Sequence, residues 1–250
     1  MTLLAIDAGN TNVKWALHDG AAWHGHGSAL TAAVRAQGLA IEVDGVQRIV
    51  ASNVAGQEVA GALTRLASRL NAPLTIIASR AAQCGVTSGY LDPCQLGTDR
   101  WAALIGARAM QTGECAIMVV LAGTALTVDA LDATGQHLGG IILPGTALMH
   151  TSLARGTAQL PHGEGAAPAF PASTVEAISR GIADAQTGAV ERFHRRAIER
   201  CGQDMAAVGA GGGIRALVPN LPFPVAIHDN LIFNGLAEIA READGTIDPH

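Results

Sequence analysis

Short apolar runs separated by turn residues open the chain. Residues 3–6 are continuously apolar, which is typical of a buried strand, and the polar and glycine residues of segment 7–12 predict a turn after it. Further strands are expected at 13–17 and, with a weaker pattern, at 22–28. Asp19-Gly20 between them favours a hairpin. The N-terminal region therefore predicts three consecutive strands.

The same order of elements returns in the middle of the chain. Residues 116–121 are a second continuous apolar run, a turn is expected at 122–125, and two more strands are expected at 126–131 and 137–143. A shift of 114 residues superposes Ala8-Gly9 on Ala122-Gly123. An internal repeat of this size predicts two similar domains.

Alternating helices and strands follow each opening. The remaining predicted elements are helices at 57–70, 98–111 (with Thr98 as candidate N-cap), 174–200 and 230–240, and strands at 49–52, 74–78, 205–209 and 224–227. This order predicts an α/β fold with two domains, residues 1–114 and 115–250, each a mixed sheet flanked by helices. The connections 79–97 and 151–173 are long and rich in Gly and Pro, so they are expected to be functional or mobile.

Composition excludes several classes of protein. The 250 residues are 49% hydrophobic, which supports compact domains and argues against disorder. A net charge of −5 without a Lys/Arg run argues against a nucleic-acid partner. The strongest apolar stretch, 116–122, is too short to cross a membrane. No signal-peptide pattern and no CxxC pair are present, so we expect a cytoplasmic protein with reduced thiols.

Two glycine turns, one in each half, are candidate phosphate sites. Glycine lets backbone N–H groups approach a phosphate closely. Asn10, Thr11 and Thr124 add side-chain donors, and Lys14, the single lysine, adds a point charge. Asp7 ends the first strand and could hold Mg²⁺ through water. The alternative is that each turn is a plain hairpin turn whose polar side chains satisfy local backbone groups.

Asp99 and Arg100 begin a predicted helix directly after a long loop. The carboxylate could accept a hydroxyl proton, and the guanidinium could bind a carboxylate substrate. Alternatively, Asp99 only complements the helix dipole. Tyr90, the single tyrosine, is a candidate ligand contact in that loop, or a packing residue. The glycines of segment 209–214 miss the dinucleotide fingerprint; they suit close approach of a flat ligand such as adenine, or a helix cap.

Several of these motifs together resemble a known superfamily. Segments 7–11 and 123–125 are similar to the phosphate motifs of the acetate kinase, sugar kinase, Hsp70 and actin superfamily. Over nearly its whole length the chain resembles type III pantothenate kinase. The segments that carry this resemblance are Tyr90, Pro93, Leu96 to Trp101, Gly139 to Ile141, Pro144-Gly145, Thr157-Ala158, Leu160-Pro161, Ser173-Thr174, Ala177-Ile178 and Gly181.

The resemblance implies a fold, an activity and a set of site residues. It implies two ribonuclease H-like (actin-like ATPase) domains with a cleft between them, and ATP-dependent phosphorylation of pantothenate to 4′-phosphopantothenate, the first step of coenzyme A synthesis. In that family the aspartate matching Asp99 is the general base. Pantothenate contacts match Tyr90, Gly97, Thr98, Asp99, Arg100 and, from the partner subunit of a homodimer, Thr174. ATP and its Mg²⁺ are held at positions matching Asp7, Ala8, Gly9, Asn10, Thr11, Asn12, Val13, Lys14, Gly123 and Thr124.

One position departs from the family pattern. Many members bind a monovalent cation with an aspartate where this chain has Leu121, so a potassium or ammonium requirement stays open. Asp129 on the next predicted strand is a weaker candidate metal ligand. Two other functions also stay open: a kinase of the same superfamily with another hydroxyl acceptor, and a non-enzymatic regulator that kept the ATP-binding fold. Intact Asp7, Asp99 and Arg100 argue against the regulator.

Overall fold

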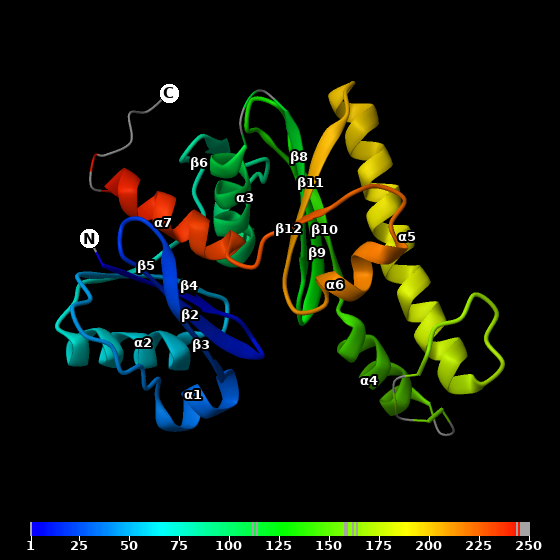
Figure 1. Ribbon diagram of the computed structural model, residues 1–250, viewed down its shortest axis with the longest axis horizontal. Helices are drawn as coiled ribbons and strands as arrows, with labels where there is room; N and C mark the ends of the chain where they lie inside the picture. The colour runs from blue at the N-terminus through cyan, green and yellow to red at the C-terminus, as the bar shows by residue number, and fades with distance from the viewer. Residues whose placement is uncertain are drawn as a thin grey trace. The chain divides into compact units, whose positions relative to one another are not determined.

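The protein divides into two compact units, each built on one five-stranded mixed sheet. The computed structural model describes residues 2–111, 113, 115–157, 160–161, 163, 165–243 and 245. The first unit comprises Met1–Gly113 with Asn230–His250, and the second comprises Glu114–Asp229. In Figure 1 the blue strands near the start of the chain and the red helix α7 (Leu231–Ala243) both belong to the first unit.

The first sheet has the strand order β3-β2-β1-β4-β5. Its strands are β1 (Leu3–Ala8), β2 (Asn12–His18), β3 (Trp23–Leu30), β4 (Arg48–Asn53) and β5 (Leu74–Ile76). β1 is antiparallel to β2 and parallel to β4. Figure 1 shows α2 (Gln57–Leu70) and α7 (Leu231–Ala243) on opposite faces of this sheet.

Side-chain alternation along β1 decides what each face of the first sheet carries. Leu4 and Ile6 are fully buried in a core that includes Val34 of α1 (Thr31–Gln37) and Leu63 of α2. Neighbouring residues of a strand point to opposite faces. Asp7 therefore projects to the other face, where α3 (Thr98–Met110) and α7 pack on the strands.

The helices α3 and α7 pack at unusually close range within the first unit. A Cβ added to Gly235 would lie 1.8 Å from the carbonyl oxygen of Ala102, and one added to Gly106 would lie 2.2 Å from that of Leu231. The expected second domain, 115–250, included α7, whereas the structure places α7 in the first unit. The reason is this packing of two glycine-bearing helices, which strand and helix order alone does not reveal. Glu114, at the expected boundary, lies outside the described residues.

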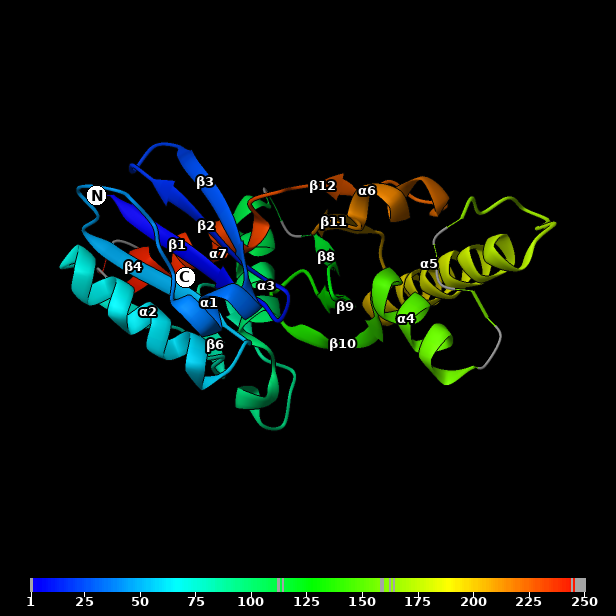
Figure 2. The same cartoon turned by 90° about the horizontal axis from the view of Figure 1, so that it is seen from below.

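The second sheet repeats the topology of the first. Its order is β10-β9-β8-β11-β12, which again places the third, second, first, fourth and fifth strands side by side. The strands are β8 (Ala116–Ala122), β9 (Ala125–Leu131), β10 (His137–Pro144), β11 (Met205–Ala210) and β12 (Ala226–Ile227). Figure 2 shows the long helix α5 (Thr174–Cys201) in this unit, with α4 (Thr146–Gly156) and α6 (Ile214–Leu217).

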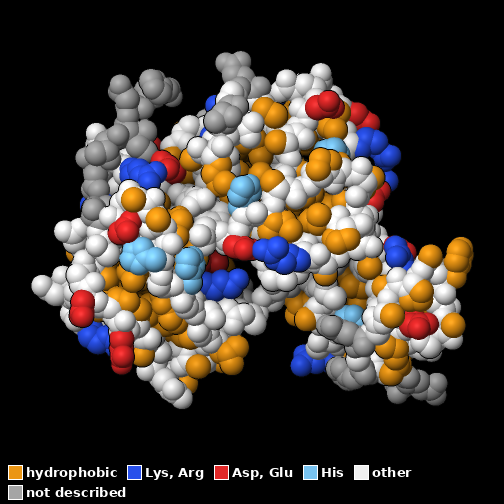
Figure 3. Space-filling view, in the orientation of Figure 1, with side chains coloured by type: hydrophobic (Ala, Val, Ile, Leu, Met, Phe, Trp, Pro, Cys, Tyr) orange, Lys and Arg blue, Asp and Glu red, His pale blue; other side chains and the backbone are white. Residues whose placement is uncertain are grey.

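The elements expected from sequence periodicity are present, with ends shifted by a few residues. The elements not foreseen are α1, α4, α6, the hairpin of β6 (Ala82–Gln83) and β7 (Val86–Thr87), and the 3₁₀ turns Pro93–Gln95 and Val218–Asn220. They are short or lack a strong apolar repeat. Within the described residues no helix is both long and apolar enough to span a bilayer. On the face in Figure 3, basic side chains are scattered among acidic and apolar ones rather than gathered in a patch.

Candidate functional site

A row of polar side chains crosses the first sheet near the end of β1. Asp7 pairs with Lys14 on antiparallel β2 and with Ser52 on parallel β4. Side chains directly opposite each other on adjacent strands share a face of the sheet. Ser52 is fully buried, and its hydroxyl lies 2.9 Å from that of Thr98 in the first turn of α3. The strand register therefore brings Asp7 and Lys14 to the face where α3 begins.

Asp7 has an unusual electrostatic environment. Its Oδ1 atom is fully buried and has no hydrogen-bond partner among the described residues. Burial raises the pKa of its carboxyl to about 7, the charge of Asp99 adds to that rise, and Lys14 opposes it. A buried carboxylate oxygen with no partner fits a hydrated cation, because a cation supplies the positive charge or hydrogen-bond donors that the oxygen lacks. Asp7 thus fits the expected role at Mg²⁺.

The turn after β1 is held by a residue that the sequence interpretation missed. The Gly9 N–H donates to the Asn12 carbonyl at 3.0 Å. Thr31, fully buried at the start of α1, donates its hydroxyl to the Gly9 carbonyl at 2.7 Å and its N–H to the Thr11 carbonyl at 2.9 Å. Asn10 and Thr11 themselves are exposed. No sequence signal marked Thr31, because its role depends on the β3 hairpin returning to the turn.

The start of α3 brings together Tyr90, Asp99 and Arg100. Gly97, not Thr98, is the N-cap residue, so the expected cap was wrong: the Thr98 hydroxyl lies within hydrogen-bonding distance of Ser52 instead. Asp99 is partly buried, and its Oδ1 accepts a hydrogen bond from the backbone N–H of Arg100 at 2.8 Å. The Arg100 side chain is buried, its Nη1 donates to the Tyr90 hydroxyl at 3.1 Å, and its guanidinium lies 5.7 Å from the Tyr90 ring centre.

Three glycines hold the second-half turn, Gly123-Thr124, in place. The Gly145 N–H donates to the Thr124 carbonyl, and the Gly213 N–H donates to the Ala122 carbonyl, both at 2.9 Å. A Cβ at Gly145 would lie 2.3 Å from the Gly123 oxygen, and a Cβ at Gly211, whose φ is +101°, would lie 2.4 Å from the Ala122 oxygen. Only glycine permits these backbone approaches.

A small pocket adjoins this turn within the second unit. Its lining residues come from β8, β9, α4, α5 and α6, and are Ala122, Gly123, Leu126, Gly145, Thr146, Gln186, Gly213 and Leu217. Gln186 is buried, and its side chain accepts the Thr146 hydroxyl at 3.1 Å and donates to the Pro144 carbonyl at 3.2 Å. Gln186 therefore fixes the segment that presses on the turn. The apolar pattern of α5 gave no signal for this residue.

The structure also describes three further positions that the sequence singled out. Asp129 is buried on β9, and its Oδ1 lies 2.9 Å from His137 Nε2, so this carboxylate already has a protein partner. Thr174 is the exposed first residue of α5. Leu121 pairs with Thr127 on β9. Among the described residues no group of three or more His, Cys, Asp or Glu could hold a metal ion. Ala158, in one resemblance segment, lies outside the described residues.

Comparison with known sequences decides the family. The sequence profile of type III pantothenate kinase matches residues 3–196. The chain belongs to the type III pantothenate kinase family. The enzyme of that name from Aromatoleum aromaticum is 43% identical over 241 residues, which cover 96% of this chain and 98% of that one. The one from Nitrosospira multiformis is 40% identical over 251 residues, covering 98% and 93%.

Solved structures show the same fold at lower identity. A Campylobacter jejuni protein assigned to the Baf family of transcriptional activators has a TM-score of 0.62 at 21% identity, covering 97% of this chain and 99% of its own. A Sinorhizobium meliloti protein assigned as a 2-dehydro-3-deoxygalactonokinase has a TM-score of 0.55 at 17% identity, covering 96% and 99%. The pantothenate kinase family chain therefore has the fold of the sugar kinase and actin-like superfamily.

Proposed function

We propose that this chain transfers the γ-phosphoryl group of ATP to the primary hydroxyl of pantothenate, giving 4′-phosphopantothenate in the first step of coenzyme A synthesis. Membership of the type III pantothenate kinase family carries the proposal. The cluster at the start of α3 supports it independently, because it joins a carboxylate, a buried guanidinium and a phenol at one place.

Asp99 is the proposed general base. It lies in the first turn of α3, partly exposed, where its carboxylate can accept the proton of the attacking hydroxyl. Its hydrogen bond from the Arg100 backbone N–H fixes the carboxylate orientation. The proton moves from the pantothenate hydroxyl to Asp99 as the oxygen attacks phosphorus, and ADP leaves on the opposite side.

Arg100 and Tyr90 are the proposed determinants of the acceptor. Pantothenate carries a carboxylate, and a guanidinium binds a carboxylate through paired N–H donors. Arg100 is buried except for 4% of its surface, so a ligand it reaches is partly withdrawn from water. The Tyr90 hydroxyl, which accepts from Arg100, holds the guanidinium in place. Gly97 and Thr98 of the same subunit are proposed as further substrate contacts. Thr174 is proposed as a contact from the partner subunit.

The two glycine turns are the proposed ATP-phosphate sites. Residues 7–14 would bind phosphate through backbone N–H groups, Asn10, Thr11 and Lys14, and Gly123-Thr124 would do so in the second unit. Asp7 is the proposed residue at Mg²⁺, since its buried oxygen has no partner among the described residues. Bound Mg²⁺ neutralises charge that develops on the phosphates. The pairing of Asp129 with His137 gives no support to a metal role for Asp129.

A homodimer in the cytoplasm is the proposed assembly. Apolar side chains exposed on the second unit support a dimer. No residue of α4 is buried, and Leu148 and Leu153 on that helix are exposed. Ile142 on β10 and Phe170 expose 63% and 93% of their surfaces. A subunit contact would withdraw these apolar side chains from water. Light scattering behind size-exclusion chromatography tests the assembly directly.

The test of the function is ADP release from purified protein with Mg-ATP, with and without pantothenate. Parallel reactions contain no monovalent cation, K⁺ or NH₄⁺, because Leu121 leaves that requirement open. An acceptor in which an alcohol replaces the pantothenate carboxylate tests the role of Arg100. Pantothenate-dependent ADP release that falls with the alcohol supports the proposal. ATP binding without pantothenate-dependent release in any cation would favour another acceptor or a regulatory role instead.

A further inference from the structure

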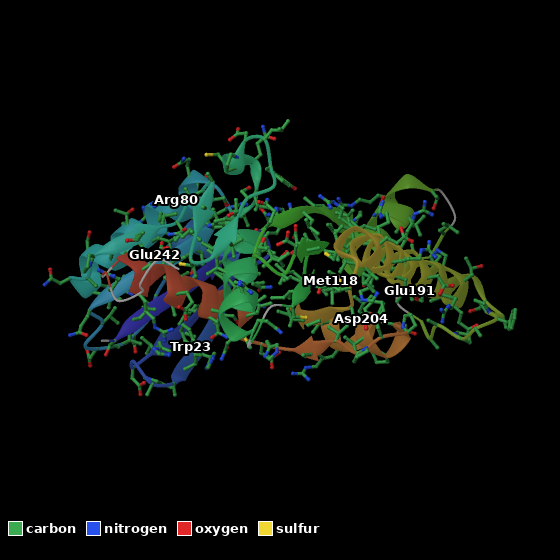
Figure 4. All side chains as sticks on the ribbon, turned by 90° about the horizontal axis from the view of Figure 1, so that it is seen from above. Trp23, Arg80, Met118, Glu191, Asp204 and Glu242 are labelled. Atoms are coloured by element: carbon green, nitrogen blue, oxygen red, sulfur yellow. The ribbon has the colours of Figure 1, made fainter. Side chains whose placement is uncertain are left out.

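The hairpin formed by β6 and β7 is fastened at its tip by the last helix of the chain. Cys84 and Gly85 form the two-residue turn, with φ values of +48° and +72°, as a type I′ turn requires. The Cys84 N–H lies outside the strand ladder and donates to Glu242 Oε1 at 2.9 Å. Figure 4 labels Glu242, near the end of α7, and Arg80, two residues before β6.

A second hydrogen bond extends this fastening toward the start of α3. The Gln83 amide donates to Glu242 Oε2 at 3.0 Å and accepts the indole N–H of Trp101 at 3.3 Å. Both carboxylate oxygens of Glu242 are thus used by the hairpin. Trp101 is fully buried and directly follows Arg100. The series Glu242–Gln83–Trp101 therefore connects the end of α7 to the residue beside the proposed acceptor site.

The location of Glu242 on its helix is electrostatically unfavourable. It lies in the last turn of α7, where the helix dipole favours basic side chains and disfavours a carboxylate. Its two hydrogen bonds to the hairpin offset this cost. Burial together with the neighbouring Glu242 carboxylate raises the pKa of the Cys84 thiol to about 12, so the thiol stays neutral beside the carboxylate.

The hairpin in turn fixes the backbone that carries Tyr90. The Ser88 N–H donates to the Ala81 carbonyl at 2.8 Å, which closes the base of the hairpin. The Tyr90 N–H lies 3.3 Å from the Ser88 hydroxyl, and the Tyr90 phenol meets Arg100. Tyr90 is three residues beyond the end of β7, so a displaced hairpin would carry Tyr90 away from Arg100.

We infer that Glu242 is a positioning residue for the acceptor site. By holding the β6–β7 hairpin, it keeps the Tyr90 hydroxyl hydrogen-bonded to Arg100. The Arg100 guanidinium thereby stays oriented to bind the pantothenate carboxylate. The inference rests on the proposed function for its kinetic part. Both carboxylate oxygens of Glu242 bond to the hairpin and Glu242 is not among the proposed acceptor contacts, so its loss should weaken acceptor binding and leave phosphoryl transfer intact.

Three variants test the inference. Glu242→Ala removes both hydrogen bonds to the hairpin, and Glu242→Gln keeps an acceptor for the Cys84 backbone N–H. Gln83→Ala removes the hydrogen bond between Gln83 and Glu242 from the hairpin side. The matched control is Glu238→Gln, one turn earlier on α7, where Glu238 pairs with Arg241 of its own helix. Two readouts are used: amide hydrogen exchange over residues 82–92 without substrate, and KM for pantothenate, KM for ATP and kcat.

The expected result for Glu242→Ala is faster exchange over residues 82–92 and a KM for pantothenate about tenfold higher, because both charge-assisted hydrogen bonds that hold the hairpin are lost. KM for ATP and kcat should stay within about twofold, as for a group that affects only acceptor binding. Gln83→Ala should resemble Glu242→Ala, and Glu242→Gln should lie between Glu242→Ala and the control.

Three outcomes would overturn the inference. Exchange no faster than in Glu238→Gln would show that Glu242 does not hold the hairpin. Faster exchange with an unchanged KM for pantothenate would show that the hairpin does not position the acceptor site. A joint loss in kcat and both KM values, with a lower melting temperature, would indicate a general structural role. If the unaltered protein does not turn over pantothenate, the proposed function fails. Hydrogen exchange over residues 82–92 then still decides whether Glu242 holds the β6–β7 hairpin and the segment that carries Tyr90.

Discussion

The carboxylates of Asp7 and Asp99 lie close enough in the first unit for the charge of Asp99 to raise the pKa of Asp7. Asp7 is the next-to-last residue of β1 and Asp99 lies in the first turn of α3, so the sheet and the helix bring two negative charges together. Lys14, directly across from Asp7, offsets part of the repulsion. A protein keeps such a repulsive pair where a cation or a proton transfer needs it.

Asp7→Asn should stabilise the protein at high pH. The pKa of Asp7 is about 7 in the folded state, above its ordinary value near 4, so the folded state favours the protonated form. The unaltered protein therefore loses stability as pH rises from about 4 through 7, whereas the Asn variant does not. We expect the difference in unfolding free energy to grow by ~4 kcal/mol between pH 4 and pH 8, because each unit of pKa difference between the folded and unfolded states contributes about 1.4 kcal/mol.

Urea unfolding at several pH values, in buffer containing a chelator, measures this difference. Asp44→Asn is the control, since Asp44 is an exposed carboxylate of the same unit. It should show no such growth with pH. A difference between Asp7→Asn and the unaltered protein that is the same at pH 4 and pH 8 would contradict the raised pKa.

Asp99→Asn should abolish most turnover without unfolding the protein. An amide cannot take the hydroxyl proton, but it can still accept the Arg100 N–H through its oxygen. We expect kcat to fall by ~10²-fold or more, with a melting temperature close to that of the unaltered protein. Steady-state kinetics with pantothenate measures the change, and Asp44→Asn again serves as the control. Unchanged turnover in a folded Asp99→Asn variant would remove Asp99 from the mechanism.

The sequence was enough to predict the two sheets, because each opens with short apolar strands separated by turn residues. It also singled out Asp7, Asp99 and Arg100 as candidates from their residue types and their places next to turns, and the roles of these residues stay predictions. It could not predict Thr31 or Gln186, because their roles come from hydrogen bonds to backbone far away in sequence. The placement of α7 in the first unit likewise depends on the fit of Gly106 against Gly235, which no local pattern encodes.

Gly145→Ala should weaken ATP binding through the second-half turn. The new Cβ would lie 2.3 Å from the Gly123 oxygen and 2.6 Å from the Thr124 oxygen, so the turn must move. We expect the dissociation constant for ATP to rise about tenfold or more, which corresponds to about 1.4 kcal/mol. Isothermal titration calorimetry measures it. Gly156→Ala, at the other end of α4 with nothing within 4 Å of its added Cβ, should bind ATP normally. Equal affinity in the two variants would rule out a phosphate role for the Gly123 turn.

Gly235→Ala should destabilise the first unit strongly. Its Cβ would meet the Ala102 carbonyl at 1.8 Å, and because that neighbour is backbone, α3 and α7 would have to separate. We expect a loss of ~3 kcal/mol in unfolding free energy, as for severe overpacking. Gly188→Ala on α5 is the matched control, since its added Cβ meets nothing within 4 Å and should stabilise its helix by ~0.5–1 kcal/mol. Urea unfolding of both variants gives the comparison. Because the first residues of α3 include Asp99 and Arg100, the Gly235 variant should lose turnover at temperatures where it is still folded. A Gly235→Ala protein as stable and active as the control would mean that α3 and α7 pack less closely in solution.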